Sequence, residues 1–196
     1  MKTSVSICSL TFALASGVLS LGPALAADYN NGYLSDTGTS YLSELRMGVL
    51  SHDVERREKG TLDIQAEVLF QPFGGLTEDA SFWNRILAPR PHIGVSVNTG
   101  GDTSYAYAGA SWLFPVYGPV FIEASFGGAV HNGKLKDVSP KREPLGTRAL
   151  FRESGSIGFD YDRFRFMVTV EHLSNAGLGT WNHGLTQVGG RVGYKF

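Results

Sequence analysis

Cysteine is almost missing from this chain of 196 residues, and the single one, Cys8, lies within the first 26. Those residues are expected to form an export signal, because Lys2 precedes an apolar run and the small residues at 24–26 fit a cleavage site. We expect cleavage before Ala27, which removes Cys8. A mature chain without a thiol excludes disulfide bridges, a thiolate nucleophile and cysteine-based metal sites.

Long apolar segments are missing after residue 26, so no transmembrane helix is expected there. The earlier apolar run could serve as a membrane anchor, but it is short and a cleavage pattern follows it at once. The net charge is −1 and there is no basic block, which argues against nucleic acid as a partner. The sequence has no metal-binding or phosphate-loop motif, so neither a metal nor another cofactor is expected.

Glycine (25 residues) and aromatic residues (12%) are abundant, which is typical of β proteins of the bacterial envelope. Alternating apolar and polar residues predict eight strands. They lie near residues 44–52, 61–70, 90–98, 104–114, 119–130, 148–161, 163–174 and 186–196. An even number of antiparallel strands with a terminal aromatic, Phe196, indicates an all-β fold: an eight-stranded transmembrane β-barrel over residues 27–196.

The polar face of these strands carries charges of both signs. Its charged residues include Arg46, Glu67, Glu123, Arg165, Glu171, Arg191 and Lys195. An eight-stranded barrel has an interior only wide enough for side chains, so we expect a filled polar interior of ion pairs rather than a channel. The alternative is a soluble lipid-binding barrel, with the apolar face inside and the charges outside. Long strands and the aromatic end favour the membrane.

The connections between strands predict which end of the barrel faces outward. The short turns at 116–118 and 161–162 are expected to be periplasmic, and the loops 131–147 and 175–185 external. The segment 71–90 is long for a periplasmic turn; Thr77 is expected to cap a short helix that ends at Leu87 and lies at the membrane–water boundary. The loop 131–147 carries several cations, which are either solvated or contact phosphates of the anionic outer leaflet.

His172 and Ser174 lie two residues apart near the end of a predicted strand, and therefore on the same face. That face also carries Phe164, Val168 and Val170, so both side chains should face lipid. A hydroxyl whose proton is taken by a neighbouring imidazole opens ester carbonyls well. The glycine-rich loop that follows offers backbone N–H donors. The alternative is a polar pair near the lipid headgroups without a chemical role.

Several motifs extend this pattern. They are Gly146-Thr147-Arg148, Leu150-Phe151-Arg152, His172-x-Ser174-Asn175-Ala176-Gly177, Asn182-x-Gly184 and Gly193-Tyr194-x-Phe196. Together they resemble the lipid A 3-O-deacylase (PagL) family of outer-membrane barrels. This resemblance implies an esterase that removes the 3-hydroxyacyl chain from the lipid A of lipopolysaccharide with a Ser–His–Glu triad on the lipid-facing side of the barrel.

By this resemblance, Ser174 is the nucleophile and His172 its general base. Asn175 and Gly177 would stabilise the oxyanion, and Asn182 is a supporting residue. The resemblance places the mature protein in the bacterial outer membrane, with lipopolysaccharide as its substrate. Formation of a homodimer is left open.

The chain departs from the family where the triad acid is expected, because that position holds Thr186. Its hydroxyl could hold His172 instead, or a water could. Glu171 is adjacent to His172 but points into the barrel. If residues 161 and 162 form the turn, His172 faces Phe151 and Glu153 is its diagonal neighbour on the outer face.

Glu153 is therefore the candidate substitute carboxylate, with Arg148 or Arg152 as alternative ionic partners. The missing acid also favours a second function, a non-enzymatic outer-membrane barrel that acts in adhesion or envelope integrity.

Overall fold

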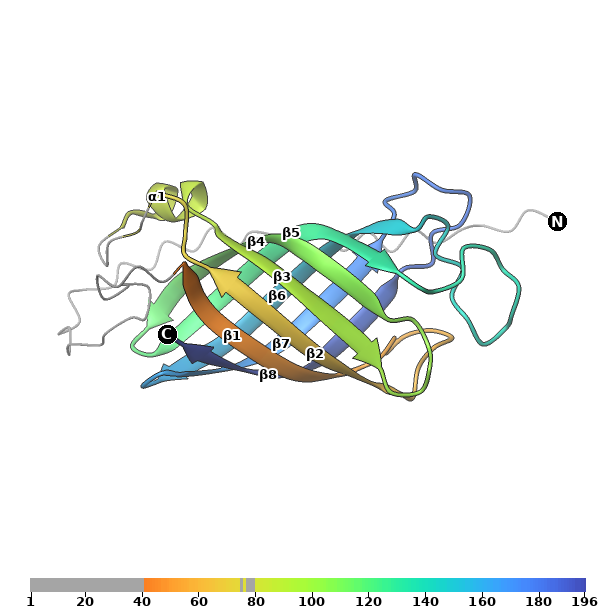
Figure 1. The fold of residues 1–196 in the computed structure, drawn as a ribbon, viewed down its shortest axis with the longest axis horizontal. Helices are drawn as coiled ribbons and strands as arrows, with labels where there is room; N and C mark the ends of the chain where they lie inside the picture. Colours follow the sequence, from red (N-terminus) through yellow and green to blue (C-terminus); the bar gives the residue numbers. More distant parts are fainter. Residues whose placement is uncertain (1–40, 75, 77–79) are drawn as a thin grey trace.

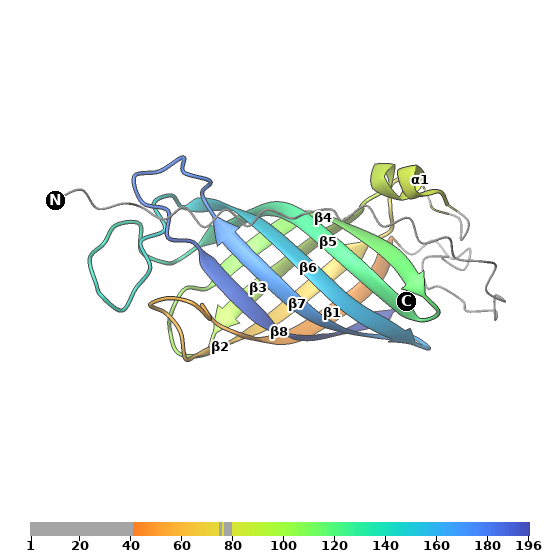
Figure 2. The same ribbon diagram turned by 180° about the vertical axis from the view of Figure 1, so that it is seen from behind.

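The computed structural model describes residues 41–74, 76 and 80–196. The predicted export signal, the cleavage site before Ala27 and the proposed cap Thr77 lie outside these residues. Eight antiparallel strands, each paired with its neighbours in the chain, form a closed barrel in which β1 also pairs with β8 (Figures 1 and 2). The predicted fold is confirmed. The strands are β1 Leu42–Ser51, β2 Leu62–Phe70, β3 Arg90–Asn98, β4 Tyr105–Tyr117, β5 Val120–His131, β6 Ala149–Tyr161, β7 Phe164–Ser174 and β8 Leu185–Lys195.

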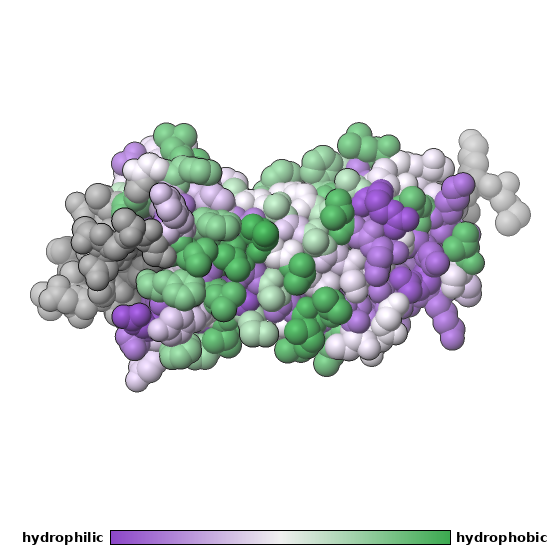
Figure 3. Space-filling view, in the orientation of Figure 1, coloured by the Kyte–Doolittle hydropathy of each residue, from purple (hydrophilic) through white to green (hydrophobic). Residues whose placement is uncertain are grey.

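The two ends of the barrel differ. One end, called the terminal end here, carries the helix α1 (Phe82–Leu87), the tight turns at 118–119 and 162–163 and the C-terminus (Figure 1). The connections 52–61, 99–104, 132–148 and 175–184 lie at the other, the loop end. Apolar residues cover much of the barrel wall, and hydrophilic residues gather at the loop end (Figure 3). This is the distribution of a barrel whose wall faces lipid.

The helix α1 is shorter than predicted, because it begins at Phe82 rather than soon after Thr77. Ser81 caps it, since its hydroxyl accepts a hydrogen bond from the backbone N–H of Asn84. Phe82 stacks on Phe114 of β4, so the helix lies against the outside of the barrel. Within the described part of the chain, no α-helix has the length and apolar composition needed to cross a membrane.

The barrel interior is a packed polar core. Arg46 donates hydrogen bonds to Glu44 (2.7 Å), Glu67 (3.2 Å) and Glu123 (2.6 Å). Nearer the loop end, Glu171 accepts hydrogen bonds from Arg152 and from Arg191. All the charged residues that the sequence assigned to the inner face are buried, whereas the apolar faces of the strands are exposed. The soluble barrel with an apolar interior is therefore wrong, and the filled polar interior is confirmed.

Candidate active site at the loop end

His172 and Ser174 close the outward-facing row of β7, at the loop end of the barrel. Both side chains are half-buried, whereas Val168 and Val170 below them are exposed. Leu173 between them points inward and is fully buried. The imidazole and the hydroxyl therefore share the outer, lipid-facing surface where an apolar wall meets polar loops.

Thr186 lies directly opposite His172 on β8. Its Oγ1 is 2.9 Å from the imidazole Nδ1, which is hydrogen-bonding distance. In the tautomer with a proton on Nδ1, the ring donates to Thr186 and Nε2 is left free to accept a proton. The Thr186 hydroxyl is thus a hydrogen-bond partner of the His172 imidazole, as the sequence suggested.

Glu153 faces His172 directly across the β6–β7 pair, and Phe151 faces Ser174. The sequence-based register, in which Phe151 faced His172, is wrong by two residues. The turn consists of Asp162 and Arg163, with Asp162 at a positive φ of 51°, rather than of residues 161 and 162. This correction brings Glu153 closer to the imidazole than predicted, because directly opposed Cβ atoms lie about 4.5–5.5 Å apart.

The ionic partners proposed for Glu153 are engaged elsewhere. Arg152 points into the barrel and binds Glu171, because it is adjacent on β6 to the outward-facing Glu153 and neighbouring strand residues face opposite sides. Arg148 donates hydrogen bonds to the carbonyl oxygens of His131 (3.0 Å) and Gly133 (3.1 Å). Glu171 is fully buried in the interior, which confirms that it does not belong to this outer site.

The loop 175–184 is organised by two asparagines. The buried Asn175 amide donates to the carbonyl oxygens of Leu145 (2.9 Å) and Trp181 (2.6 Å), and its Oδ1 accepts from the N–H of Gly177 (2.9 Å). The Asn175 N–H in turn donates to Oδ1 of Asn182 (2.9 Å). The donors expected at the oxyanion therefore already have acceptors within the loops, and the asparagines fix the shape of the chain beside Ser174.

Two glycines of the predicted motifs are required by close packing at this site. Gly184 has a φ of +69°, and a Cβ added there would lie 3.0 Å from Cε1 of His172 and 2.9 Å from the carbonyl oxygen of Leu173. Gly146 has a φ of +78°, and a Cβ there would collide with the carbonyl oxygen of Trp181. Glycine tolerates both backbone conformations without steric cost.

Sequence reasoning missed the contribution of the loop 52–61. The N–H of Val54 donates to the carbonyl oxygen of Thr186 (2.9 Å), which brings this loop against the site. Glu55 and Arg56 interact electrostatically with His172, as Glu153 does. No motif marks this loop, because its proximity results only from closure of the barrel between β1 and β8.

Buried polar contacts join the loops. His52 lies between Asp63 (2.7 Å) and Glu58 (3.1 Å). Burial alone would lower the pKa of His52, but its hydrogen bonds to these carboxylates raise it to about 9. Burial opposes ionisation of Glu58 as well, yet the hydrogen bonds from His52 and backbone N–H groups lower its pKa to about 2. The two side chains therefore form an ion pair at neutral pH.

The same contacts reach the loops 132–148 and 175–184. Arg142 donates to Glu58 (2.9 Å), and the fully buried Glu143 accepts from the backbone N–H of Arg57 (2.7 Å). Glu143 also contacts Nδ1 of His183 (2.8 Å), which lies between two predicted motif residues. Three loops are thus held together beside Ser174.

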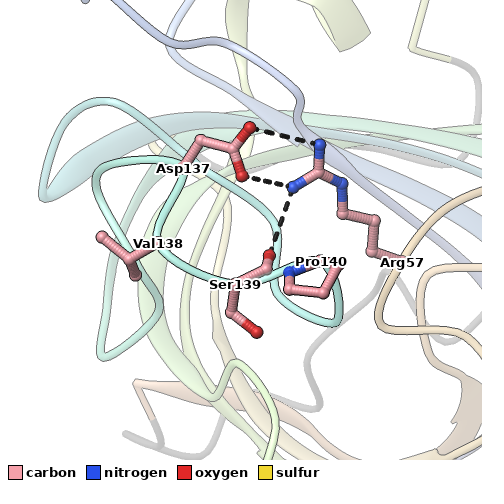
Figure 4. A pocket seen from close by; sticks show the side chains of 5 residues that line it. All are labelled: Arg57, Asp137, Val138, Ser139 and Pro140. Carbon is pink, nitrogen blue, oxygen red and sulfur yellow. Dashed lines mark hydrogen bonds and ion pairs between the residues drawn. The ribbon is translucent and has the colours of Figure 1, made fainter.

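A shallow depression of about 430 Å³ lies between the loops 52–61 and 132–148 (Figure 4). It is lined by Arg57, Asp137, Val138, Ser139 and Pro140. The Arg57 guanidinium is paired with Asp137 at 2.6 Å, and the lining includes none of the predicted catalytic residues. Contact of the loop cations with phosphates therefore stays a prediction. Among the described residues, no cluster of His, Cys, Asp or Glu is arranged to hold a metal ion.

Comparison with known proteins gives one family. The family model described as lipid A 3-O-deacylase (PagL) matches residues 88–195, which is more than half of the chain and includes β3 to β8. No curated protein sequence matches this chain. Neither the family match nor the structural matches support the homodimer left open above.

Three solved structures are similar to this chain to different degrees. A crystal structure of the outer membrane enzyme PagL covers 79% of this chain and all of that chain, with 15% identity and a TM-score of 0.62. A de novo designed transmembrane β-barrel covers 81% of this chain and 98% of that chain (10% identity, TM-score 0.49). The Yersinia pestis outer membrane protein Ail covers 80% and 100% (13% identity, TM-score 0.45). At 15% identity, the match to the PagL crystal structure shows a shared fold alone.

Proposed function

The chain belongs to the lipid A 3-O-deacylase (PagL) family of the outer membrane, and from this we propose that Ser174 and His172 hydrolyse the 3-position acyl ester of lipid A. The observation that carries the proposal is the position of the pair. A hydroxyl and an imidazole share the outer face of β7, directly above an apolar wall. A substrate that is itself a membrane lipid reaches such a site without leaving the bilayer.

The reaction follows from the two side chains. Ser174 Oγ attacks the ester carbonyl carbon while its proton passes to Nε2 of His172. The tetrahedral intermediate collapses, and the imidazolium returns the proton to the leaving oxygen of the sugar, which releases lipid A with a free 3-hydroxyl. Water then attacks the acyl-enzyme with His172 again as the base, so the products are the fatty acid and regenerated Ser174.

The oxyanion requires donors close to Ser174. Asn175 and Gly177 are the residues that the family resemblance assigns to this role. In the structure, their donors hold the loop together, as does Asn182. We therefore propose that these three residues act first by shaping the loop beside the nucleophile; direct stabilisation of the oxyanion by Asn175 and Gly177 stays a prediction.

The deciding experiment compares the refolded mature barrel with its Ser174→Ala variant on lipopolysaccharide in detergent, with lipid A weighed by mass spectrometry. Ser139→Ala, in the loop 132–148, is the matched control. We expect wild type and Ser139→Ala to remove one hydroxyacyl chain, and Ser174→Ala to remove none. A parallel reaction with phosphatidylethanolamine tests whether phospholipid esters are hydrolysed as well.

The absence of a carboxylate at Thr186 favours one other function, a non-enzymatic barrel that acts in adhesion or envelope integrity. A folded wild-type barrel that leaves lipid A and phospholipid unchanged would support this alternative and contradict the esterase.

A further inference from the structure

Glu153 occupies an unusual place on β6. The outward-facing row of this strand also contains Gly155 and three apolar side chains that are exposed on the barrel wall, those of Phe151, Ile157 and Phe159. Glu153 is exposed in the same row. A carboxylate on the lipid-facing side of a barrel is unfavourable unless a partner or a function compensates for it.

The cross-strand neighbours of Glu153 identify that partner. On β5 it faces Phe126, which offers no charge, and on β7 it faces His172. The two arginines close to it in the sequence are engaged elsewhere: Arg152 of β6 in the interior, and Arg148, just before β6, on backbone carbonyls. His172 is therefore the neighbour whose protonated form the carboxylate would stabilise.

In a serine–histidine–acid triad, the acid performs two tasks: it orients the imidazole and it stabilises the imidazolium that forms during the reaction. In this structure, Thr186 holds Nδ1 of the ring from β8 at 2.9 Å, which accomplishes the first task without a charge. Glu153 stands on the opposite flank, on β6.

We propose that the two tasks of the triad acid are divided here: the Thr186 hydroxyl orients His172, and the Glu153 carboxylate stabilises its charged form. Both are positioning residues that act through His172. The inference rests on the proposed function, since it concerns the same site. The other charged groups that interact with the imidazole are Glu55 and Arg56 of the loop 52–61, which carry opposite signs and act on its charged form in opposite directions.

The test measures lipid A deacylation by Glu153→Gln, Glu153→Asp and the control Asp162→Asn. Asp162 lies in the turn at the terminal end with a φ of 51°, which asparagine also adopts, so the control removes one charge far from the site. We expect Glu153→Gln to lower kcat about 10- to 100-fold with little change in KM. We expect Glu153→Asp to keep most of the activity, and Asp162→Asn to match wild type.

Two further readouts separate a charge effect from a structural one. The acidic limb of the activity–pH profile should move to lower pH by about one unit in Glu153→Gln, because the imidazolium loses a stabilising charge. Thr186→Glu restores a carboxylate beside Nδ1 and should therefore make Glu153→Gln nearly harmless. We expect the double variant Thr186→Glu, Glu153→Gln to have a kcat at least tenfold above that of Glu153→Gln alone.

Activity of Glu153→Gln within about twofold of wild type, with an unchanged pH profile and an inactive Ser174→Ala, would overturn the inference and leave the esterase intact. If wild-type protein itself leaves lipid A unchanged, the proposed function fails and this inference fails with it.

Discussion

Thr186 Oγ1 lies 2.9 Å from Nδ1 of His172, at the position where the family resemblance leads us to expect the acid of the triad. A hydroxyl orients the imidazole by one hydrogen bond but brings no charge to it. A carboxylate at this position would both orient the imidazole and stabilise its charged form, whereas the Thr186 hydroxyl can only orient it.

Substitutions at Thr186 should show this difference. Thr186→Val keeps the shape and removes the hydrogen bond, so we expect kcat to fall about tenfold. Thr186→Glu adds a second carboxylate, directly beside Nδ1, so we expect kcat to rise by about 10-fold or more. The measurement is the initial rate of fatty acid release from lipopolysaccharide at saturating substrate. Equal rates for Thr186→Val and wild type would show that the hydroxyl does not orient the ring.

Gly184→Ala should inactivate the site while the barrel still folds. The new methyl group would lie 3.0 Å from Cε1 of His172 at a φ of +69°, so the ring must shift from its present position. We expect kcat to fall about 100-fold, as for small misplacements of catalytic groups. Gly101→Ala is the control, because Gly101 has a φ of +83° and open space around it. Equal losses in both variants would indicate backbone strain rather than displacement of the imidazole.

Protection of the loop 52–61 from proteolysis should depend on pH through His52. The pKa of His52 is raised from 6.5 to about 9 in the folded protein, so its contribution to stability is complete below pH 6.5 and is lost as the pH rises through about 9. We expect trypsin cleavage in this loop, normalised to a peptide substrate, to increase between pH 8 and 10. His52→Asn should be cleaved readily at both pH values. Unchanged protection of wild type at pH 10 would contradict the prediction.

Arg46→Ala should destabilise the barrel strongly, since it leaves Glu44, Glu67 and Glu123 buried around a missing cation. Removing one partner of a buried ion pair costs about 3–5 kcal/mol of the free energy of unfolding. The measurement is urea-induced unfolding in lipid vesicles, followed by tryptophan fluorescence. Met47→Ala, whose side chain faces lipid on the same strand, should have a much smaller effect. Comparable losses in the two variants would show that the interior ion pairs do not dominate stability.

Much of the barrel could be predicted from residue periodicity. Alternation with a period of two decides which side chains share a face, so the inner charges and the outward His172 and Ser174 were predicted correctly. Strand ends differed by only a few residues, although β4 extends beyond the predicted 114 to Tyr117. The alternation alone could not say which face is inside; closure of the strands around the charged side chains decides that.

Register could not be predicted with the same certainty. Moving the β6–β7 turn from residues 161–162 to 162–163 shifts every pair across these strands by two residues, which keeps the faces but changes the partners. Glu153 became the direct rather than the diagonal neighbour of His172 for this reason. The participation of the loop 52–61 had no local signal at all, because it depends on the pairing of β1 with β8.

The sequence by itself determined the strand periodicity, the gathering of charged side chains on one face and the placement of His172 and Ser174 together on the opposite face, since each depends only on the spacing of residues along a strand. Only the tertiary structure decided how that pair is surrounded: Glu153 directly opposite His172 on one flank, Thr186 within hydrogen-bonding distance on the other and Gly184 against the ring. These neighbours come from two strands, β6 and β8, and from the loop 175–184. They are brought together by hydrogen-bond register and by closure of the barrel, neither of which is encoded in a local sequence pattern.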